Sequence, residues 1–265
     1  MNWKKNVIPF FASISLMACS ASPTGRNQLL LFSDSQMNSL GAQSFEQMKQ
    51  SQPINHDKKV NNYVQCVANT VTQNVAKTGF ANWEVVVFES EQVNAFALPG
   101  GKIGVYTGLL KVATNQDQLA TVIGHEVAHV IAEHGNERMS QSSLASTGLQ
   151  LSSLVIGTSQ YAQYHDVAVA ALGIGVQYGI VLPYGRSQES EADMIGVELM
   201  AKSGFDPQAS IQLWKNMSAA SNGQQVPELL STHPSHSTRI KDLSNKIRTL
   251  PKTQASQPNC GSIKL

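Results

Sequence analysis

The residues with the clearest potential for chemistry are His125, Glu126 and His129, which form the pattern His-Glu-x-x-His. Two histidines four residues apart on a helix project from one face about one turn apart, so both imidazoles can reach a single Zn²⁺ ion. Glu126 is adjacent and can take a proton from a metal-bound water as a general base. The other interpretation is a pair of core histidines, which the apolar flanks disfavour because uncompensated buried imidazoles are costly.

A catalytic zinc site usually has three protein ligands and a position for water, so a third ligand is expected elsewhere in the chain. The extended metzincin pattern would require Gly at 132 and His at 135, but the sequence has Ala132 and Gly135 and excludes it. His134 lies nine residues after His125, and a continuing helix would turn it to the opposite side. We therefore expect His134 to be a surface histidine.

Two acidic residues further along the chain offer the missing ligand. Glu189 and Asp193 are four residues apart and share a helix face, whereas Glu191 is turned away by about 200°. Glu189 as the third ligand and Asp193 as a hydrogen-bond acceptor for a ligand histidine form a coherent site. A solvated acidic face is the alternative that composition alone leaves open.

The surrounding pattern predicts the elements that would position these residues. Apolar residues at spacings of three and four predict helices over residues 57–77, 116–139, 187–203, 207–220 and 237–250. Short apolar runs bounded by turn residues predict strands over residues 83–88, 94–98 and 103–106. The expected fold class is α+β and mainly α-helical, with a small sheet next to the His-Glu-x-x-His helix.

The composition excludes two other classes of protein. Only 14% of the 265 residues are charged, and 19 basic against 18 acidic side chains give a net charge of +1. Nucleic-acid binding requires a basic surface to neutralise phosphates, so no nucleic-acid partner is expected. A disordered chain is excluded because 42% of the residues are hydrophobic.

The first residues are typical of an export signal. Two lysines precede an uncharged run over residues 7–18, which is shorter than the roughly 20 residues that a membrane-spanning helix needs. Cys19 directly follows Leu16-Met17-Ala18, a pattern that resembles the bacterial lipoprotein motif in which the cysteine is acylated. We expect lipidation at Cys19, and Ser20 favours delivery to the outer membrane. An ordinary cleaved signal or an uncleaved anchor is the alternative.

Export would place the two remaining cysteines, Cys66 and Cys260, in an oxidising compartment. We predict that they form a disulfide, which would close a loop of about 195 residues and tie the carboxy-terminal tail to the helix that contains Cys66. Two free buried thiols are the alternative.

The stretch between Met139 and Gly185 has Asp166 as its only formal charge. Within it, residues 167–182 form an apolar run of 16 residues that contains several glycines. Because this run is short for a membrane span, we favour a buried helix or a lid packed over a cleft; a membrane span or a membrane-dipping element is the alternative.

Motifs in order along the chain, over about residues 40–250, resemble the M48 family of zinc metallopeptidases. They are Asn94-Ala95-Phe96-Ala97-Leu98-Pro99-Gly100-Gly101, Thr107-Gly108-Leu109-Leu110, Gly124-His125-Glu126-x-x-His129, Arg186-x-x-Glu189-x-x-x-Asp193 and Thr232-His233-Pro234-Ser235. The resemblance is greatest to the periplasmic lipoprotein members of the family, which are thought to act in outer-membrane protein quality control.

The resemblance implies a zincin-like fold with one Zn²⁺ per chain, bound by His125, His129 and Glu189. Glu126 would be the catalytic base and Asp193 a supporting residue, while Glu191 matches a variable position.

His233 matches a histidine that can approach and occlude the zinc. It would act either as a removable fourth ligand that keeps the enzyme latent or as a donor that stabilises the oxyanion. The strand around residues 94–98 would bind an extended substrate as an added strand, through Asn94, Ala95, Phe96 and Ala97.

These patterns predict an organisation of four parts. They are a signal peptide over 1–18, a tether and first helix over 19–50, an M48-type peptidase domain over 51–250 with a lid or substrate-guiding insert over 139–185, and a tail over 251–265.

The expected function is that of a zinc-dependent endopeptidase, lipid-anchored to the bacterial outer membrane and facing the periplasm. Its expected substrates are misfolded or unfolded envelope proteins, and outer-membrane assembly machinery is an expected partner. The alternative is a zinc-stabilised chaperone or binding module for outer-membrane protein assembly with little or no proteolysis. The presence of Glu126 favours the protease, because a structural zinc site does not need a base beside its ligands.

Overall fold

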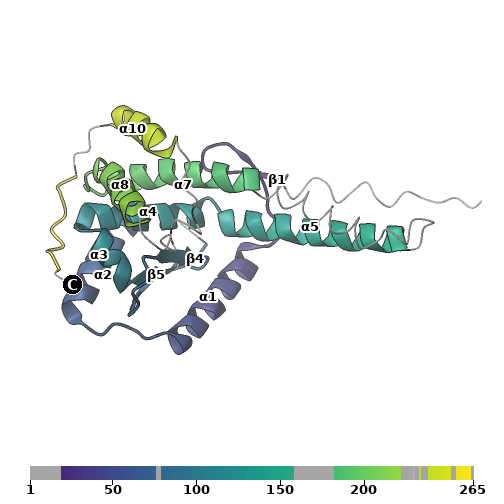
Figure 1. Ribbon diagram of the computed structural model, residues 1–265, viewed down its shortest axis with the longest axis horizontal. Coiled ribbons are helices and arrows are strands. Elements are labelled where there is room, and N and C mark those ends of the chain that lie inside the picture. Colours follow the sequence, from purple (N-terminus) through teal and green to yellow (C-terminus); the bar gives the residue numbers. More distant parts are fainter. Residues whose placement is uncertain are drawn as a thin grey trace, which may run out of the picture.

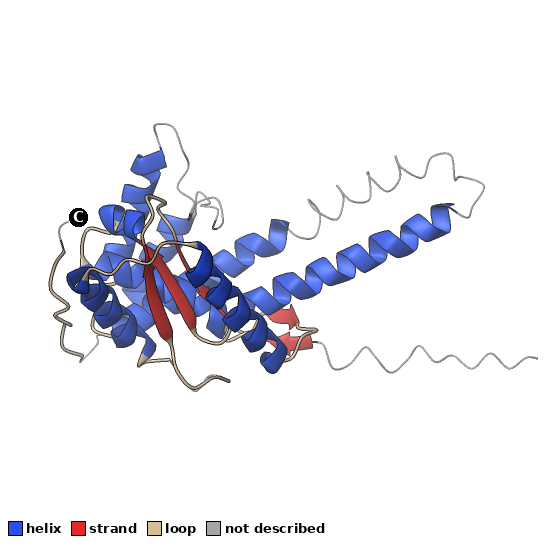
Figure 2. Cartoon of the chain, turned by 90° about the horizontal axis from the view of Figure 1, so that it is seen from below, coloured by secondary structure: helices blue, strands red, loops and turns tan. Residues whose placement is uncertain are grey.

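The computed structural model describes residues 19–75, 79–157, 182–221, 229, 233, 238–251 and 255–263. Its elements are β1 (Cys19–Ala21), β2 (Asn27–Leu29), α1 (Asp34–Ser51), α2 (Lys58–Thr72), β3 (Glu84–Phe88), β4 (Ala95–Leu98), β5 (Lys102–Tyr106), α3 (Thr107–Val112), α4 (Gln116–Ile131), α5 (His134–Gly157), α7 (Leu182–Lys202), α8 (Ala209–Ser221) and α10 (Arg239–Thr249). The expected signal peptide and nearly all of the apolar run over 167–182 lie outside the described residues. The mainly helical α+β class is confirmed, with helices around a small sheet (Figure 2).

The main sheet has three strands in the order β3-β5-β4. β3 runs parallel to β5, with Val85 opposite Ile103, and β4 runs antiparallel to β5, with Ala97 opposite Ile103. The tight turn between β4 and β5 contains Gly100 and Gly101 at φ values of 82° and 73°, which glycine adopts without strain. β4 pairs only with β5 among the described strands, so it is an edge strand of this sheet.

The hydrophobic core lies between this sheet and helices that include α2, α4 and α8. Asp57 caps the amino terminus of α2, because its side chain accepts hydrogen bonds from the backbone N–H groups of Lys59 and Val60. The valines of α2, predicted to form one apolar stripe, are buried in this core. A second hydrophobic cluster lies between α1 and the sheet. It contains the rings of Phe45, Phe88, Phe96 and Tyr106.

Helices α4 and α7 lie side by side and carry the three predicted ligands, His125, His129 and Glu189 (Figure 1). A Cβ atom on Gly124 of α4 would come within 2.9 Å of the carbonyl oxygen of Gly196 in α7. A side chain at either position would therefore force the helices apart. Because Gly124 directly precedes His125, this contact determines how close α7 comes to the histidines.

The single helix predicted over 116–139 is in fact two helices. α4 ends at Ile131, and Glu133 adopts φ 52°, which turns the chain before α5 begins at His134. α5 then extends away from the rest of the described chain (Figures 1 and 2). The residue with positive φ is a glutamate rather than the usual glycine or asparagine, so the apolar periodicity continues past the break without a stop signal. The motif Thr107-Gly108-Leu109-Leu110 lies in the short helix α3.

Residues 19–29, part of the expected tether, form a two-stranded antiparallel hairpin in which Ser20 lies opposite Gln28. Strand β2 packs against α5. The buried side chain of Gln28 donates a hydrogen bond to the carbonyl of Ala132, at 2.6 Å, where α4 ends. The hairpin therefore contacts the same turn that separates α4 from α5.

A disulfide joins Cys66 of α2 to Cys260 near the carboxy terminus, the pair that the cysteine usage predicts. Its sequence separation of 194 residues ties the tail to the core helix α2. None of the described helices is both long and apolar enough to cross a membrane.

Candidate metal centre

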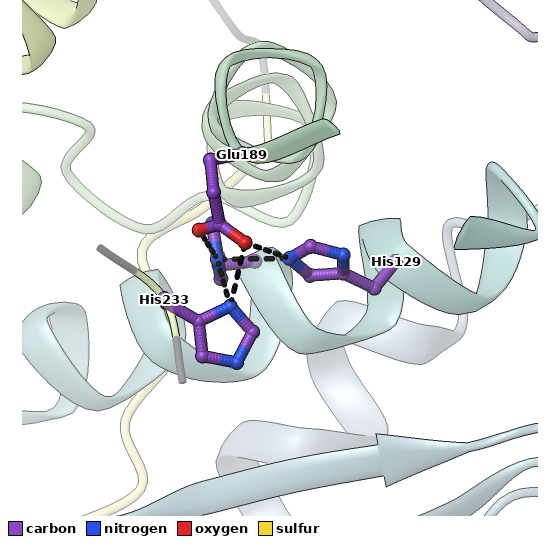
Figure 3. A group of neighbouring side chains, drawn as sticks. His129, Glu189 and His233 are labelled. Atoms are coloured by element: carbon purple, nitrogen blue, oxygen red, sulfur yellow. Dashed lines mark hydrogen bonds and ion pairs between the residues drawn. The ribbon is translucent and has the colours of Figure 1, made fainter. Parts of the chain in front are cut away.

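Four side chains from three parts of the chain converge beside α4. His125 and His129 come from α4, Glu189 from α7 and His233 from the segment before α10, and one ligand atom of each lies within 4.8 Å of all the others. Figure 3 shows Glu189, His129 and His233 pointing toward a common point between their elements. The spacing argument singled out the first three as ligands, and the family resemblance added His233.

The cluster has the donor chemistry of a zinc site, because imidazole nitrogens and a carboxylate are ligands that zinc takes. Nε2 of His125 lies 3.1 Å from Nε2 of His129 and 3.2 Å from Oε2 of Glu189. Among the described residues, Oε1 of Glu126 is buried without a hydrogen-bond partner. Buried polar atoms normally have partners, so this oxygen indicates a site for an ion and its water. The residues present fit a zinc ion.

On one side of the cluster, Asp193 and Arg239 orient His125. Oδ1 of Asp193 lies 3.0 Å from Nδ1 of His125, so the carboxylate accepts the ring proton and leaves the Nε2 lone pair facing the cluster. Arg239 donates from Nη2 to Oδ1 of Asp193 at 2.7 Å, and its Nε lies 2.7 Å from Oδ2. The guanidinium stacks 3.5 Å above the ring of Trp214. Asp193 therefore occupies the place that the sequence predicts for it.

On the other side, a longer series of contacts orients His129. Nδ1 of His129 lies 2.9 Å from Nδ1 of His134, and Nε2 of His134 lies 3.1 Å from Oε2 of Glu191. The prediction that His134 is a surface histidine is wrong: it is 1% exposed, because the chain turns after α4 instead of continuing as one helix. Glu191 is turned away from Glu189 as predicted, but it is buried against His134 rather than solvated.

These contacts continue into the N-terminal hairpin. Nε of Arg26 donates to Oε2 of Glu191 at 2.9 Å, and its two terminal nitrogens donate to Glu137 at 2.6 and 2.7 Å. Gln188, the neighbour of Glu189, also donates to Glu137, at 2.8 Å. Burial opposes the ionisation of Glu191, but hydrogen bonds outweigh it and lower its pKa to about 2, the donors being Ser22, Thr24, His134 and Arg26.

The charges in the cluster favour a cation. Burial and the neighbouring His125 lower the pKa of His129 well below 6.5, which keeps this imidazole in the neutral form that binds metal. Burial would also lower the pKa of His125, but hydrogen bonds to Asp193 and Glu189 outweigh it and raise that pKa to about 9. Burial likewise opposes the ionisation of Glu189, yet hydrogen bonds to His125 and His233 lower its pKa far below 4.5. Two carboxylates thus attract positive charge to this point, and a divalent cation supplies it.

His233 lies between two carboxylates. Its Nδ1 is 3.0 Å from Oε1 of Glu189, and its Nε2 is 3.4 Å from Oε1 of Glu126. The backbone N–H of His233 donates to the carbonyl of Leu229 at 2.9 Å, and the N–H of Leu229 donates to the carbonyl of Val93 at 3.1 Å. The histidine is therefore connected to the loop that leads into β4.

A cavity of about 450 Å³ opens beside the cluster, and Glu126, His129 and His233 are among the residues that line it. Phe96 and Ala97 of β4 also line it. The other two predicted substrate-binding residues, Asn94 and Ala95, are not among its lining residues, although Ala95 is buried in the adjacent core.

The sequence from residue 58 to residue 247 matches the model of peptidase family M48. This chain belongs to peptidase family M48. The assignment agrees with the motifs quoted from the sequence. It makes zinc the ion that the four-residue cluster fits, and it confirms the zincin-like fold class.

Curated M48 relatives come from mitochondria and from bacteria. The mitochondrial metalloendopeptidase OMA1 of Danio rerio is 35% identical over 257 residues, which is 91% of this chain and 52% of the relative. The OMA1 of Bos taurus is 31% identical over 256 residues, 89% of this chain and 47% of the relative. The beta-barrel assembly-enhancing protease of Escherichia coli K12 is 28% identical over 216 residues, 80% of this chain and 44% of the relative. The chain spans about half the length of the relatives it matches.

Sequence reasoning missed Arg239 and Arg26, which neutralise the carboxylates behind the two histidines. Arg239 was detectable in principle, because it lies four and eight residues before Leu243 and Ile247 on the apolar face of α10. A cation in such a stripe indicates a buried partner of opposite charge. Arg26 had no comparable signal, since it lies in a short polar hairpin.

Proposed function

We propose that this chain is a zinc-dependent endopeptidase in which His125, His129 and Glu189 bind the ion and Glu126 is the catalytic base. The observation that carries the proposal is the convergence of these ligands beside a buried glutamate that lines a cavity, in a chain of the M48 family. A purely structural zinc site would not need that glutamate, so the arrangement supports hydrolysis over a binding module.

When bound, zinc supplies Lewis acidity toward water and toward the scissile carbonyl. Glu126 takes the proton from the attacking water and delivers it to the leaving amine. Its carboxylate suits this role because it is 3% exposed and its Oε1 has no hydrogen-bond partner among the described residues. Asp193 and Arg239 keep the Nδ1 proton of His125 on the side away from the cavity.

Strand β4 binds the substrate as an added strand. It is an edge strand of the described sheet, and its residues Phe96 and Ala97 line the same cavity as Glu126. Binding through main-chain hydrogen bonds selects extended polypeptide rather than a particular sequence. The substrates are therefore unfolded or misfolded proteins.

His233 acts as a removable fourth ligand that keeps the enzyme latent. Its Nδ1 lies 3.3 Å from Nε2 of His125 and 3.0 Å from Glu189, so the ring occupies the ligand cluster itself. Replacing His233 with Ala should raise the rate of peptide cleavage, measured with a fluorogenic unfolded substrate. A lower rate would assign His233 to transition-state stabilisation instead, and an unchanged rate would exclude both roles.

The protein is an outer-membrane lipoprotein that faces the periplasm, anchored by an acyl chain on Cys19. The export-signal pattern and the lipoprotein-like motif support this location, and the name of the Escherichia coli relative supports outer-membrane assembly machinery as a partner. Radioactive palmitate should label the parent expressed in bacteria but not Cys19→Ser. Equal labelling of the two proteins would contradict the anchor.

The central test compares the parent with Glu126→Gln on casein and on an unfolded outer-membrane protein. We expect both proteins to bind one zinc, and only the parent to cleave, in a manner that a chelator abolishes. Equal cleavage by both would overturn the catalytic role of Glu126, and no cleavage by the zinc-loaded parent would support the binding module. Zinc stoichiometry of Glu189→Ala tests the third ligand, because full occupancy with full activity would place that role elsewhere.

A further inference from the structure

We propose that the N-terminal hairpin is part of the zinc site, because Arg26, acting through Glu191 and His134, fixes His129 in the tautomer that binds metal. The inference rests on the proposed function, in which His129 is a ligand. It makes Arg26, Glu191 and His134 positioning residues, which we call the His129 relay.

The relay is continuous in the structure. From His129 it passes to His134 at 2.9 Å, from His134 to Glu191 at 3.1 Å, and from Glu191 to Arg26 at 2.9 Å. His134 and Glu191 are 1% and 5% exposed, so water does not compete for these contacts. Thr24 of the same hairpin donates its hydroxyl to the other oxygen of Glu191 at 2.5 Å.

The direction of each hydrogen bond follows from the groups at the far end. Arg26 can only donate, so Glu191 is the acceptor in that contact, and a carboxylate also accepts from His134. The proton of His134 is therefore on Nε2, which leaves its Nδ1 as an acceptor. His129 must then carry its proton on Nδ1 to donate to His134, and its Nε2 keeps a lone pair facing Glu189, from which it lies 3.4 Å. This is the tautomer that a metal ligand requires.

The same hairpin is also linked by hydrogen bonds to the helix that carries Glu189. Arg26 donates to Glu137 with two nitrogens, and Glu137 accepts from Gln188, the residue before Glu189. A residue far from the ligands in sequence thus contacts the supports of two of them.

The experiment measures Zn²⁺ affinity of the full chain, stripped of metal and titrated in competition with a chromophoric chelator. His134→Leu removes both hydrogen bonds at similar volume, and its zinc dissociation constant should rise by about 10–100-fold, as for other supports behind ligand histidines. His134→Gln should restore most of the affinity, because its carbonyl can accept from His129 while its amide donates to Glu191. Arg26→Gln should give a smaller rise than His134→Leu, because it acts two contacts further from His129.

The matched control is Arg248→Ala, which removes an exposed arginine from the last turn of α10 and should leave zinc affinity unchanged. An affinity of His134→Leu equal to that of the parent would overturn the relay while leaving the proposed function intact. Equal losses in folded His134→Leu and His134→Gln would overturn the hydrogen-bond account in favour of packing. A parent that binds no zinc would overturn the proposed function and the relay together.

A second measurement keeps the inference testable if His134→Leu does not fold. Imidazole ¹⁵N chemical shifts of the zinc-loaded parent distinguish protonation at Nδ1 from protonation at Nε2. We expect the proton on Nδ1 in His129 and on Nε2 in His134. The opposite tautomer in either ring, or a protonated cationic His134, would overturn the relay.

Discussion

His125 and His129 lie one helical turn apart on α4 and face the same point, yet their outer nitrogens are satisfied in different ways. Nδ1 of His125 meets the carboxylate of Asp193 directly, at 3.0 Å. Nδ1 of His129 meets another imidazole, His134, which separates it from the nearest carboxylate. One ligand is therefore oriented by a single contact and the other by a series.

The arginines behind the two histidines also differ in burial and in the part of the chain that supplies them. Arg239, behind His125, comes from α10 and has a side chain that is 0% exposed, whereas the side chain of Arg26, behind His129, is 21% exposed and belongs to the hairpin that starts at Cys19. The His125 support is part of the core. The contacts behind His129 lie at the rim of the site, so a change in the N-terminal hairpin should affect the orientation of His129 more than that of His125.

The largest effect is expected on the His125 side. Asp193→Asn removes the carboxylate that the buried Arg239 contacts at 2.7 Å, which should lower the free energy of unfolding by about 3–5 kcal/mol. An amide can also donate to Nδ1 of His125, which would place the ring proton on Nε2 and block metal binding. Thermal unfolding and chelator competition measure the two consequences.

The matched change behind His129 is Glu191→Gln, which should weaken zinc binding less than Asp193→Asn does. The intervening His134 allows the amide oxygen of Gln to accept the same hydrogen bond, so the tautomer of His129 is kept. Zinc affinities that fall equally in Asp193→Asn and Glu191→Gln would contradict the distinction between a direct contact and a relay.

Removal of the disulfide is expected to have a smaller effect, confined to stability, because the bond is not part of the Asp193–Arg239 pair or of the His129 relay. Replacing Cys66 and Cys260 with Ser should lower the free energy of unfolding by about 2–4 kcal/mol, because the unfolded chain loses its cross-link. Denaturant unfolding measures the loss, and zinc affinity should not change. A drop in zinc affinity in the folded variant would show that the tail influences the site.

The contact of Asp193 with His125 could be predicted from the sequence, and the His129 relay could not. Helical spacing placed Asp193 on the face of Glu189, and both residues lie within one unbroken helix. The relay depends on the turn at Glu133, whose positive φ carries no sequence signal, and without that turn His134 would face away from the site. The sheet and most helices followed from apolar periodicity, whereas contacts from the hairpin to α5 and α7 are long-range and leave no local pattern.

The smallest effect, and one that depends on pH, is expected at Glu137, the second carboxylate that Arg26 contacts. Burial opposes its ionisation, but hydrogen bonds from Arg26, Gln188 and Gln28 outweigh it and lower its pKa below 4.5. A carboxyl whose pKa is lower in the folded state stabilises the fold above its unfolded pKa, near 4.5, and loses that contribution as the pH falls further. Glu137→Gln should therefore cost about 1.5–3 kcal/mol at neutral pH, and less as the pH drops below 4.5.

The measurement is urea unfolding of the metal-free parent and variant across this pH range. Glu84→Gln is the matched control, because the pKa of Glu84 is also lowered, by Lys102 and Lys49, although its side chain is 38% exposed. Solvent screening should make its effect smaller at every pH. A stability difference for Glu137→Gln that stays constant from neutral pH to below 4.5 would mean that the charge of Glu137 contributes nothing. Arg26 would then stabilise this side of the site by packing rather than by its charge, unlike Arg239 on the other side.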